Sequence, residues 1–356
     1  MIKLNHYFRR NRFCLRPEQS PTHYNVCRYL QEKGWRSSRF NWQSGFTDDN
    51  LQFHLEAAQQ LEFKHHLAAL VSQYCPDIMP PTYCINDQNW PLILSQIANQ
   101  HYLQEQQCRD ELNGLAWILK PALLNNGKDI RIFQKLSDLE QHFLSSKRLG
   151  GEHVLQHYLI EPHLLREKHK YSIRMFVIIT NYAGAYLYPY GYFNVALQPF
   201  VAKDFTDLRP HLTNEHLDDN EVNVVQIPSQ RFDFFNRFYP QIKQMTSATI
   251  QGLQDLFPQA FICQKQRRLA IFGYDFMVDK HERLWLLEAN HGPCFPTSDD
   301  HPLQAHLYYD FWQAFIASFA VPIAQQCPLD KILYSPFENL LVIRNQTSFK
   351  DSGLSQ

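Results

Sequence analysis

Two acids and an amide are the residues best suited to chemistry, in a stretch that otherwise resembles two apolar strands around a charged turn. The stretch is FGYDFMVDKHERLWLLEANHGPCF, and a four-residue hairpin loop at 280–283 would place Asp275 directly opposite Glu288. Directly opposed residues on one face have Cβ atoms about 4.5–5.5 Å apart, and like charges at that separation are destabilising. The pattern therefore predicts a positive group between the two carboxylates. It also predicts that removing either carboxylate relieves their repulsion.

The type of these residues favours a hard metal ion. Asn290 lies two residues beyond Glu288, so the alternation of a strand returns its side chain to the same face. Two carboxylates and an amide oxygen suit Mg²⁺, which keeps several waters and shares itself with substrate phosphates. The opposite face is apolar, which suits burial, and consists of Phe272, Tyr274, Phe276 and Val278. The alternative is a surface hairpin whose acids face water.

A second group of candidate residues is basic. In WILKPALLNNGKDIRIF, Lys120 ends an apolar strand and Lys128 lies in the polar turn before the next strand. Two ammonium groups on a mobile hairpin could cover polyphosphate oxygens, because each lysine acts as a compact point charge. An ordinary hairpin with a lysine at its edge is the alternative.

The segment KHKYSIRMFVIIT alternates between apolar and polar residues. Its odd positions from 171 to 179 are apolar, while Lys170, Ser172 and Arg174 share the opposite face. The planar fork of Arg174 would suit a γ-phosphate or an oxyanion, because it holds two oxygens at once. Lys170 and Arg174 would repel each other if uncompensated. We therefore expect either the carboxylates of the hairpin or a bound phosphate opposite them.

Two further segments carry hydrogen-bonding groups. VLQHYLIEP is an apolar strand whose end could present backbone groups to an adenine edge, with Gln156 and Tyr158 nearby. A plain core strand is the alternative. HLTN, at residues 211–214, follows a proline and would ordinarily form a cap or an Asx-type turn.

The composition is that of a soluble globular protein. The chain has 356 residues, of which 44% are hydrophobic, and a net charge of −1, so two or three domains and no nucleic-acid partner are expected. The eight cysteines include no C-x-x-C pair, which favours reduced thiols over a zinc site or a disulfide framework. No apolar run approaches the roughly 18 residues that span a bilayer, and the N-terminus lacks a secretory signal pattern. We therefore expect a cytoplasmic protein that binds no membrane.

The elements that position these residues change character along the chain. Apolar spacing predicts helices over 24–34, 51–74 and 88–112, and strands dominate after residue 114. A helix over 229–257 separates these strands from the hairpin, and another follows near residues 302–321. The predicted fold is α+β with a mostly antiparallel sheet.

In their order and spacing, these segments resemble the tubulin tyrosine ligase family of ATP-grasp amino-acid ligases. The matching pieces are WILKP, NNGKDI, VLQHYLIEPHLL, KHKYSIRMFVIIT, AYLYPYGYF, HLTN, FGYDFMVD and LLEAN, over roughly residues 115–295. QLEFKHHLAAL and MPPTYCI resemble the region that precedes the ATP-grasp core of the family. Each piece is weak evidence alone, but their shared order makes the resemblance specific.

The resemblance implies an ATP-grasp fold, with a nucleotide between two α+β subdomains and a smaller N-terminal α/β region. The implied domains are an N-terminal region 1–112, a ligase core 113–325 and a partly disordered C-terminal extension 326–356. It implies Mg²⁺ on Asp275, Glu288 and Asn290, and catalytic roles for Lys170 and Arg174. The residues that it implies for ATP are Lys120, Lys128, Gln156, His157, Tyr158, Leu159, Lys170, Thr213 and Asn214.

The implied activity is an ATP- and Mg²⁺-dependent ligase that joins a free amino acid to a carboxylate of a protein or peptide through an acyl phosphate, and tubulin is the best-known acceptor of the family. One alternative is a ligase acting on a small molecule or a protein other than tubulin. Another is a nucleotide-binding module with little turnover. The oligomeric state is not predicted.

Two positions depart from the family pattern. Ser172 stands where the family has Asp, and Asn194 stands where it has an Arg expected near the amino acid and the transferred phosphate. An Asn cannot replace a bidentate, permanently charged fork. Arg209 and Lys203 are therefore candidates for a substitute cation, because they lie between matched segments.

Overall fold

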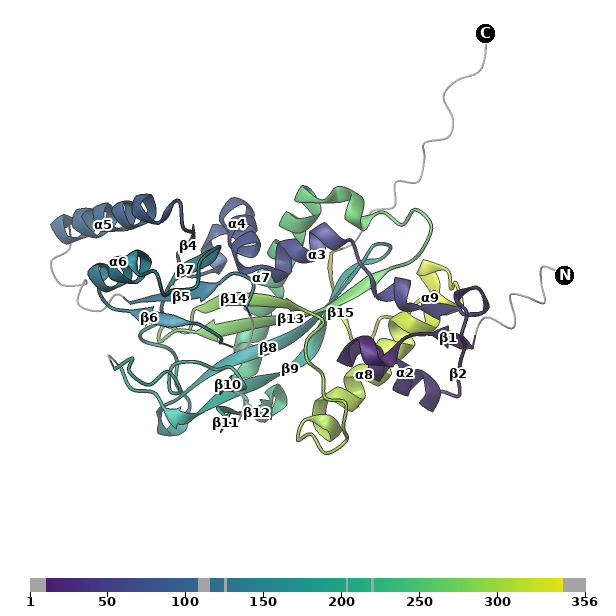
Figure 1. Cartoon of the computed structure of the whole chain (residues 1–356). Helices are drawn as coiled ribbons and strands as arrows, with labels where there is room; N and C mark the ends of the chain where they lie inside the picture. Colours follow the sequence, from purple (N-terminus) through teal and green to yellow (C-terminus); the bar gives the residue numbers. More distant parts are fainter. Residues whose placement is uncertain (1–10, 108–115, 125–126, 203, 219–220, 342–356) are drawn as a thin grey trace, which may run out of the picture.

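The computed structural model describes all residues except 1–10, 108–115, 125–126, 203, 219–220 and 342–356. Within this part, helices and largely antiparallel strands combine into an α+β fold, as predicted from the sequence. The molecule is elongated, with a small four-stranded sheet at one end, a larger sheet in the middle and a helical cluster at the other end (Figure 1).

The central sheet has six strands in the order β12-β9-β8-β13-β14, with β15 paired to β9. All its neighbours are antiparallel. The strands are β8 (His169–Thr180), β9 (Gly184–Pro199), β12 (Val224–Pro228), β13 (Leu269–Val278), β14 (Leu284–His291) and β15 (Glu338–Leu341).

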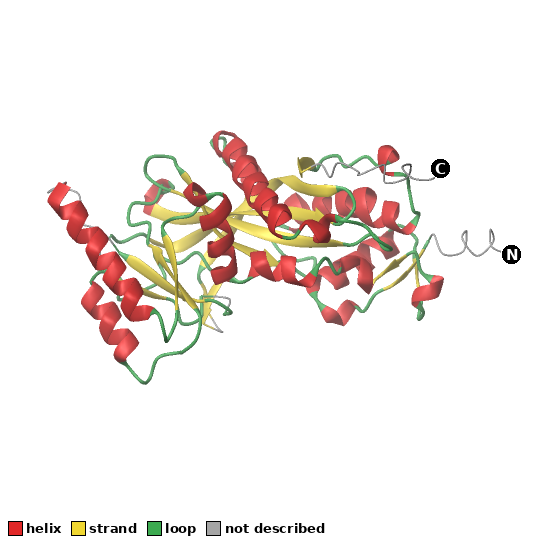
Figure 2. Ribbon diagram, turned by 90° about the horizontal axis from the view of Figure 1, so that it is seen from above, coloured by secondary structure: helices red, strands yellow, loops and turns green. Residues whose placement is uncertain are grey.

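Helices lie across one face of the central sheet, as Figure 2 shows from above. The odd residues of β8 and the even residues of β13 pack there against α3 (Leu55–Glu62), α4 (Lys64–Tyr74) and α7 (Phe235–Leu256). The predicted apolar faces of both strands are thus confirmed. Because the alternation of a strand is strict, the remaining residues of β8 and β13 face the opposite side.

This opposite face is divided along the strands. Phe176 and Ile178 of β8 pack against α2 (Pro21–Glu32) and α8 (Tyr309–Phe315), together with α9 (Val321–Ala324) and the small parallel sheet β2-β1-β3. The three short strands of that sheet are β1 (Arg12–Cys14), β2 (Arg36–Ser37) and β3 (Phe46–Thr47). Towards the start of β8 the same face carries polar residues and borders a cavity.

The four-stranded sheet has the order β4-β7-β5-β6 and is antiparallel. It comprises β4 (Thr82–Ile85), β5 (Trp117–Pro121), β6 (Arg131–Phe133) and β7 (His153–His157), backed by α5 (Trp90–Gln107) and α6 (Leu136–Leu144). The boundary expected at residue 112 falls outside the described residues, and the strands on either side of it, β4 and β5, belong to this one sheet. A short hairpin of β10 (His216–Asp218) and β11 (Glu221–Val222) lies apart from both sheets.

The helix predicted over 51–74 is interrupted. Phe63 has extended backbone angles (φ −80°, ψ 122°) between α3 and α4, and its ring stacks on His65 with centroids 6.2 Å apart. The break makes Lys64 the first residue of α4. None of the helices in the described part of the chain is long and apolar enough to cross a membrane.

The hairpin of β13 and β14 has the predicted pairing of Asp275 with Glu288, but its loop and its register differ from the prediction. The loop spans residues 279–283, one residue longer than predicted, because the Asp279 carboxylate accepts hydrogen bonds from the backbone N–H groups of His281 and Arg283. A β-bulge at Leu287 then restores the register, since Phe276 pairs with Leu286.

Candidate functional site

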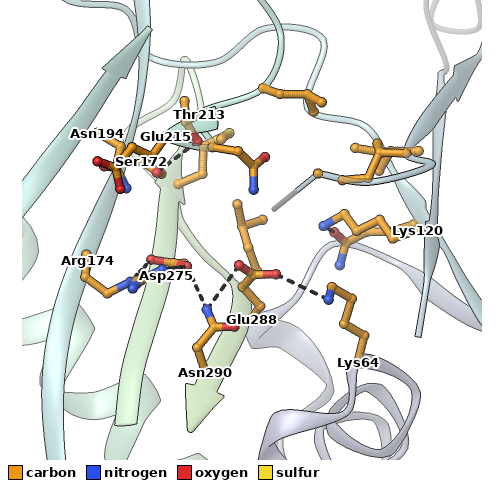
Figure 3. A pocket seen from close by; sticks show the side chains of 18 of the residues that line it. Lys64, Lys120, Ser172, Arg174, Asn194, Thr213, Glu215, Asp275, Glu288 and Asn290 are labelled. Atoms are coloured by element: carbon orange, nitrogen blue, oxygen red, sulfur yellow. Dashed lines mark hydrogen bonds and ion pairs between the residues drawn. The ribbon is translucent and has the colours of Figure 1, made fainter. Parts of the chain in front are cut away.

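A cavity of about 300 Å³ lies between the four-stranded sheet and the polar part of the central sheet. Every residue that the sequence assigned to the metal, to ATP or to catalysis lines it, and so do Ser172 and Asn194. In Figure 3 the acids lie centrally, Lys120 and Lys64 lie on one side, and Ser172, Asn194 and Thr213 lie on the other. The fold therefore brings together segments that are up to about two thirds of the chain apart, from Glu62 to Cys294.

The acidic end of the cavity consists of Asp275, Glu288 and Asn290 with the cations beside them. The Asn290 amide nitrogen donates hydrogen bonds to Asp275 Oδ2 (3.2 Å) and Glu288 Oε1 (3.1 Å). Arg174 holds Asp275 through both guanidinium branches, with Nη2 donating to Oδ2 at 2.6 Å and Nε donating to Oδ1. The predicted like-charge pair is thus bridged by an amide and compensated by Arg174.

Burial and neighbouring charges separate the two acids. Burial raises the pKa of Asp275 to about 6, against the attraction of Arg174. Burial also acts to raise the pKa of Glu288, but the charges of Lys64 and Lys120, together with hydrogen bonding by Asn290 and Asp275, lower this pKa to about 2. The Asp275 carboxylate in turn outweighs burial and keeps the pKa of Arg174 well above its usual range. Glu288 is therefore the more strongly ionised acid of the pair.

Lys64 lines the cavity, although the sequence motifs did not predict a role for it. Its Nζ lies 3.9 Å from Glu288 Oε2 and donates a 2.7 Å hydrogen bond to the carbonyl of Leu124. Lys64 thus links α4 to β14 and to the loop after β5. Lys64 is part of the matched segment QLEFKHHLAAL. A role for it can be inferred only when Phe63 is known to break the helix, because the break makes Lys64 the first residue of α4.

The lysine end of the cavity contains Lys120 and Lys170, both buried. Lys120 Nζ donates to Gln156 Oε1 at 3.0 Å, and Gln156 Nε2 donates to Thr82 Oγ1 at 2.8 Å. Burial lowers the pKa of Lys120 to about 8, although the charge of Glu288 opposes this shift. The Gln156 side chain therefore orients Lys120, a contact that the sequence did not predict.

Lys170 has only neutral partners. Its Nζ donates to the Tyr158 hydroxyl and to the His211 carbonyl, both at 2.8 Å, and lies 4.3 Å from the centroid of the Tyr158 ring. Burial, with repulsion from Lys120, lowers the pKa of Lys170 to about 7. No acid contacts this ammonium among the residues that the structure describes. It is therefore poised to lose its proton or to receive an anion.

The tautomer of His211 follows from its contacts. His211 Nε2 lies 2.6 Å from the Asp204 carbonyl, which only accepts, so this nitrogen carries the proton. Burial lowers the pKa of His211, which favours the neutral ring. Nδ1 then accepts a 2.8 Å hydrogen bond from the Tyr158 hydroxyl, whose oxygen accepts from Lys170. The loop that contains HLTN thus holds Lys170 in place.

A row of uncharged polar residues, which we call the neutral row, crosses the central sheet at the far side of the cavity. It consists of Ser172, Asn194 and Gln226, which are direct cross-strand partners in β8, β9 and β12. Of the suggested substitute cations, Arg209 is not in the cavity, because it is exposed and paired with Asp207 and Glu221. Lys203 lies outside the described residues.

The residues at the acidic end fit a magnesium ion. The described residues include no group of three or more His, Cys, Asp or Glu side chains that could hold a metal. Mg²⁺ needs no such group, because it takes few protein ligands and completes its shell with water and phosphate oxygens. A half-turn of the Asn290 amide would place its oxygen between the two carboxylates.

Comparison with known proteins gives one family and several relatives. The model of the tubulin-tyrosine ligase family matches residues 53–328. A probable tubulin polyglutamylase of Caenorhabditis elegans is 26% identical over 219 residues, which are 57% of this chain and 52% of the relative. Tubulin glycylase 3C of Tetrahymena thermophila is 25% identical over 204 residues, which are 51% of this chain and 18% of the relative. The matched segments thus span about half or less of these relatives.

Proposed function

The chain belongs to the tubulin-tyrosine ligase family, and we propose that it is an ATP- and Mg²⁺-dependent ligase that joins a free amino acid to a carboxylate of a protein or peptide. The observation that carries this proposal is a cavity between two sheets in which the acids of the hairpin face buried lysines and an arginine. In this proposal the two sheets are the halves of an ATP-grasp fold. The ligase core expected at 113–325 then extends into the N-terminal region 1–112 and the C-terminal extension 326–356, because the two sheets include β4 and β15.

The proposed nucleotide site uses the lysine end. The strand end from Gln156 to Leu159, with Thr213 and Asn214, would hold the nucleoside, and Lys120, Lys128 and Lys170 would hold the phosphates. A polyphosphate supplies the negative charge that the buried lysines otherwise lack. This would explain why two desolvated ammonium groups, Lys120 from β5 and Lys170 from β8, lie at one end of the cavity.

The proposed metal site uses the acidic end. Asp275, Glu288 and Asn290 would hold Mg²⁺, which when bound neutralises charge on the phosphate oxygens. Lys64 would keep Glu288 ionised and connect it to the loop after β5. The side chains are held in place by hydrogen bonds within the protein, so their geometry is set before the substrates bind.

The proposed reaction has two steps. A carboxylate oxygen of the acceptor attacks the γ-phosphorus, and the bond between this phosphorus and the β-phosphate oxygen breaks. The products are ADP, which is the leaving group, and an acyl phosphate on the acceptor. The amine of the donor amino acid then attacks the acyl carbon, forming the amide while inorganic phosphate leaves and the nitrogen loses a proton. In this reaction Arg174 would stabilise the transferred phosphoryl group, and Lys170 would hold that group in line; both residues line the cavity.

The acceptor that we propose is tubulin, because the relatives are named for tubulin modification. The chain matches only part of these relatives, so a different acceptor protein is the second possibility, and Ser172 and Asn194 favour it because they change the cavity wall. We also propose a cytoplasmic location.

The test is ATP-dependent incorporation of radiolabelled amino acids into purified tubulin, with ADP release measured in parallel. Label is expected only with Mg·ATP, and Glu288→Gln should abolish it, with circular dichroism verifying that the variant is still folded. Binding of Mg·ATP without ADP release, for every amino acid and with both tubulin and a cell extract as the source of acceptor, would instead identify a nucleotide-binding module. Failure to bind Mg·ATP would overturn the proposal.

A further inference from the structure

The neutral row forms one continuous wall of the cavity. Ser172 pairs with Asn194, and Asn194 pairs with Gln226, so the three side chains share the face that borders the cavity. Thr213 Oγ1 donates a 2.9 Å hydrogen bond to Ser172 Oγ, and Gln226 Nε2 donates a 3.2 Å hydrogen bond to Asn194 Oδ1. The wall is therefore built from hydroxyls and amides that hold one another in place.

One polar atom of this wall has no partner within the protein. Gln226 Oε1 is buried and makes no hydrogen bond to the described residues, although Gln226 lines the cavity. Turning both amides over would leave the amide nitrogen of Gln226 in the same situation. A buried polar atom is normally satisfied, so the unpaired atom points to a ligand group here.

Among the described residues, the charged groups around the neutral row are an acid, Glu215, and two cations whose hydrogen bonds go to other residues. Glu215 lines the cavity beside it, as Figure 3 shows, and its side chain is half exposed. Ser172 stands between Lys170 and Arg174 in β8, but Lys170 is directed to Tyr158 and His211, and Arg174 is directed to Asp275. A ligand carboxylate placed against Asn194 and Gln226 would therefore meet neutral amides and the carboxylate of Glu215.

The total charge of the cavity leads to the same conclusion. Its described Lys and Arg side chains are Lys64, Lys120, Lys128, Lys170 and Arg174, and its acids are Glu62, Glu215, Asp275 and Glu288. The five positive and four negative groups leave little excess positive charge even for Mg·ATP. A second carboxylate on the donor would have no cation of its own, and a desolvated charge without a partner is costly.

We propose that the neutral row, at the position where the family resemblance already implied contact with the amino acid, selects a donor whose side chain carries no negative charge. The inference rests on the proposed function and adds the class of donor. In this arrangement Glu215 and the amide oxygens of the row attract the ammonium group of the donor, and the amides bind uncharged polar or small side chains. Glutamate and aspartate are disfavoured because their second carboxylate meets Glu215.

The experiment measures donor binding without needing an acceptor. The full-length protein is saturated with Mg²⁺ and a non-hydrolysable ATP analogue, whose binding is first verified by calorimetry, and is then titrated with single amino acids. Glutamine against glutamate and asparagine against aspartate are matched pairs of equal size that differ in charge. We expect each neutral member to bind roughly tenfold or more tightly than its acidic partner.

Two variants and one control refine this test. Asn194→Arg and Gln226→Arg each add a cation to the neutral row and should reduce or reverse the preference for the neutral member of each pair. Val225→Arg adds the same charge to the adjacent residue of β12, which is exposed and is not part of the cavity wall, so it should leave the preference unchanged. The result for the native protein decides the proposal even if an arginine in the row prevents folding.

The outcomes separate this inference from the proposed function. Equal or tighter binding of the acidic amino acids by the native protein would overturn the inference, and so would the lack of any amino-acid binding by the nucleotide-loaded protein. Both results leave an ATP-dependent ligase intact. Failure to bind the nucleotide analogue would instead remove the proposed function on which the inference rests.

Discussion

The two ends of the cavity differ in how their buried charges are compensated. At the acidic end, Arg174 and Asp275 form a bidentate ion pair, and Asn290 bridges both acids. At the lysine end, Lys120 and Lys170 donate hydrogen bonds to groups that are all neutral among the described residues. The first end is compensated by the protein itself, whereas the second carries a desolvation cost that a bound anion would relieve.

This difference predicts which end resists mutation in the free protein and which end responds to ligand. Breaking a buried ion pair leaves an uncompensated charge, whereas removing a buried charge without an acidic partner removes a cost. Substitutions at the acidic end should therefore destabilise the protein, and those at the lysine end should weaken nucleotide binding while stabilising the fold.

The largest effect is expected for Asp275→Ala. The loss of Asp275 leaves Arg174 buried without its partner, so the free energy of unfolding should fall by about 3–5 kcal/mol and ligase turnover should be lost. Urea denaturation and ADP release measure the two effects. Like-charge repulsion alone would instead predict that Asp275→Ala stabilises the protein. The sequence did not reveal that the Asp275 carboxylate is paired with Arg174.

A double variant provides the control for this prediction. Arg174→Met combined with Asp275→Leu removes both charges and keeps similar volumes, so it should recover most of the lost stability but none of the activity. If Asp275→Ala were as stable as the native protein, the acidic end would not be compensated by Arg174, and the contrast between the two ends would fail.

The face of each strand could be predicted from the sequence because alternation along a strand has a fixed period. The period places Lys170, Ser172 and Arg174 on one face of β8, and all three line the cavity. Spacing also gave the α+β class and the opposition of Asp275 and Glu288. These features depend on local periodicity, which a single sequence contains.

Features that depend on contacts distant in sequence could not be predicted. The bulge at Leu287 and the longer loop compensate each other, so the correct pairing followed from an incorrect loop. Lys64 reaches the site only because the chain breaks at Phe63. The partner of Arg174 could only be given as one of two alternatives, because a sequence does not show which of several nearby charges make contact.

The second largest effect is expected at the lysine end. Lys170→Met removes a buried ammonium that has no acidic contact, so the free energy of unfolding of the nucleotide-free protein should rise by roughly 1–2 kcal/mol. Affinity for Mg·ATP should fall about tenfold or more, because a phosphate contact is lost. Lys331→Met, at an exposed position, should change neither quantity. A destabilised Lys170→Met protein would show that the lysine end is compensated after all.

The pH dependence of stability sharpens the same contrast. The pKa of Lys170 is lowered to about 7 in the folded protein, whereas an unfolded lysine titrates near 10.4. Between these values the unfolded chain binds more protons, so this group makes stability rise with pH across that window. The stability gained by Lys170→Met should therefore be greatest at pH 7 or below and decrease towards pH 10, by at most about 1.4 kcal/mol per pH unit.

Urea denaturation of the native protein and Lys170→Met at pH 7, 8 and 9 tests this prediction. A difference between the two proteins that stays constant over this range would mean that Lys170 keeps its proton, and hence that burial does not control its charge.

The smallest effect is expected at Lys64, which connects the two ends. Its ammonium is 3.9 Å from Glu288 and hydrogen-bonds the carbonyl of Leu124, so it is neither a close ion pair nor an isolated charge. Lys64→Met should change the free energy of unfolding by less than about 1 kcal/mol and weaken Mg·ATP binding about two- to fivefold. Lys64→Arg keeps the charge and should retain most of the native affinity, which calorimetry can measure. If Lys64→Arg were as impaired as Lys64→Met, the hydrogen bond to Leu124 rather than the charge next to Glu288 would be the contribution of this residue.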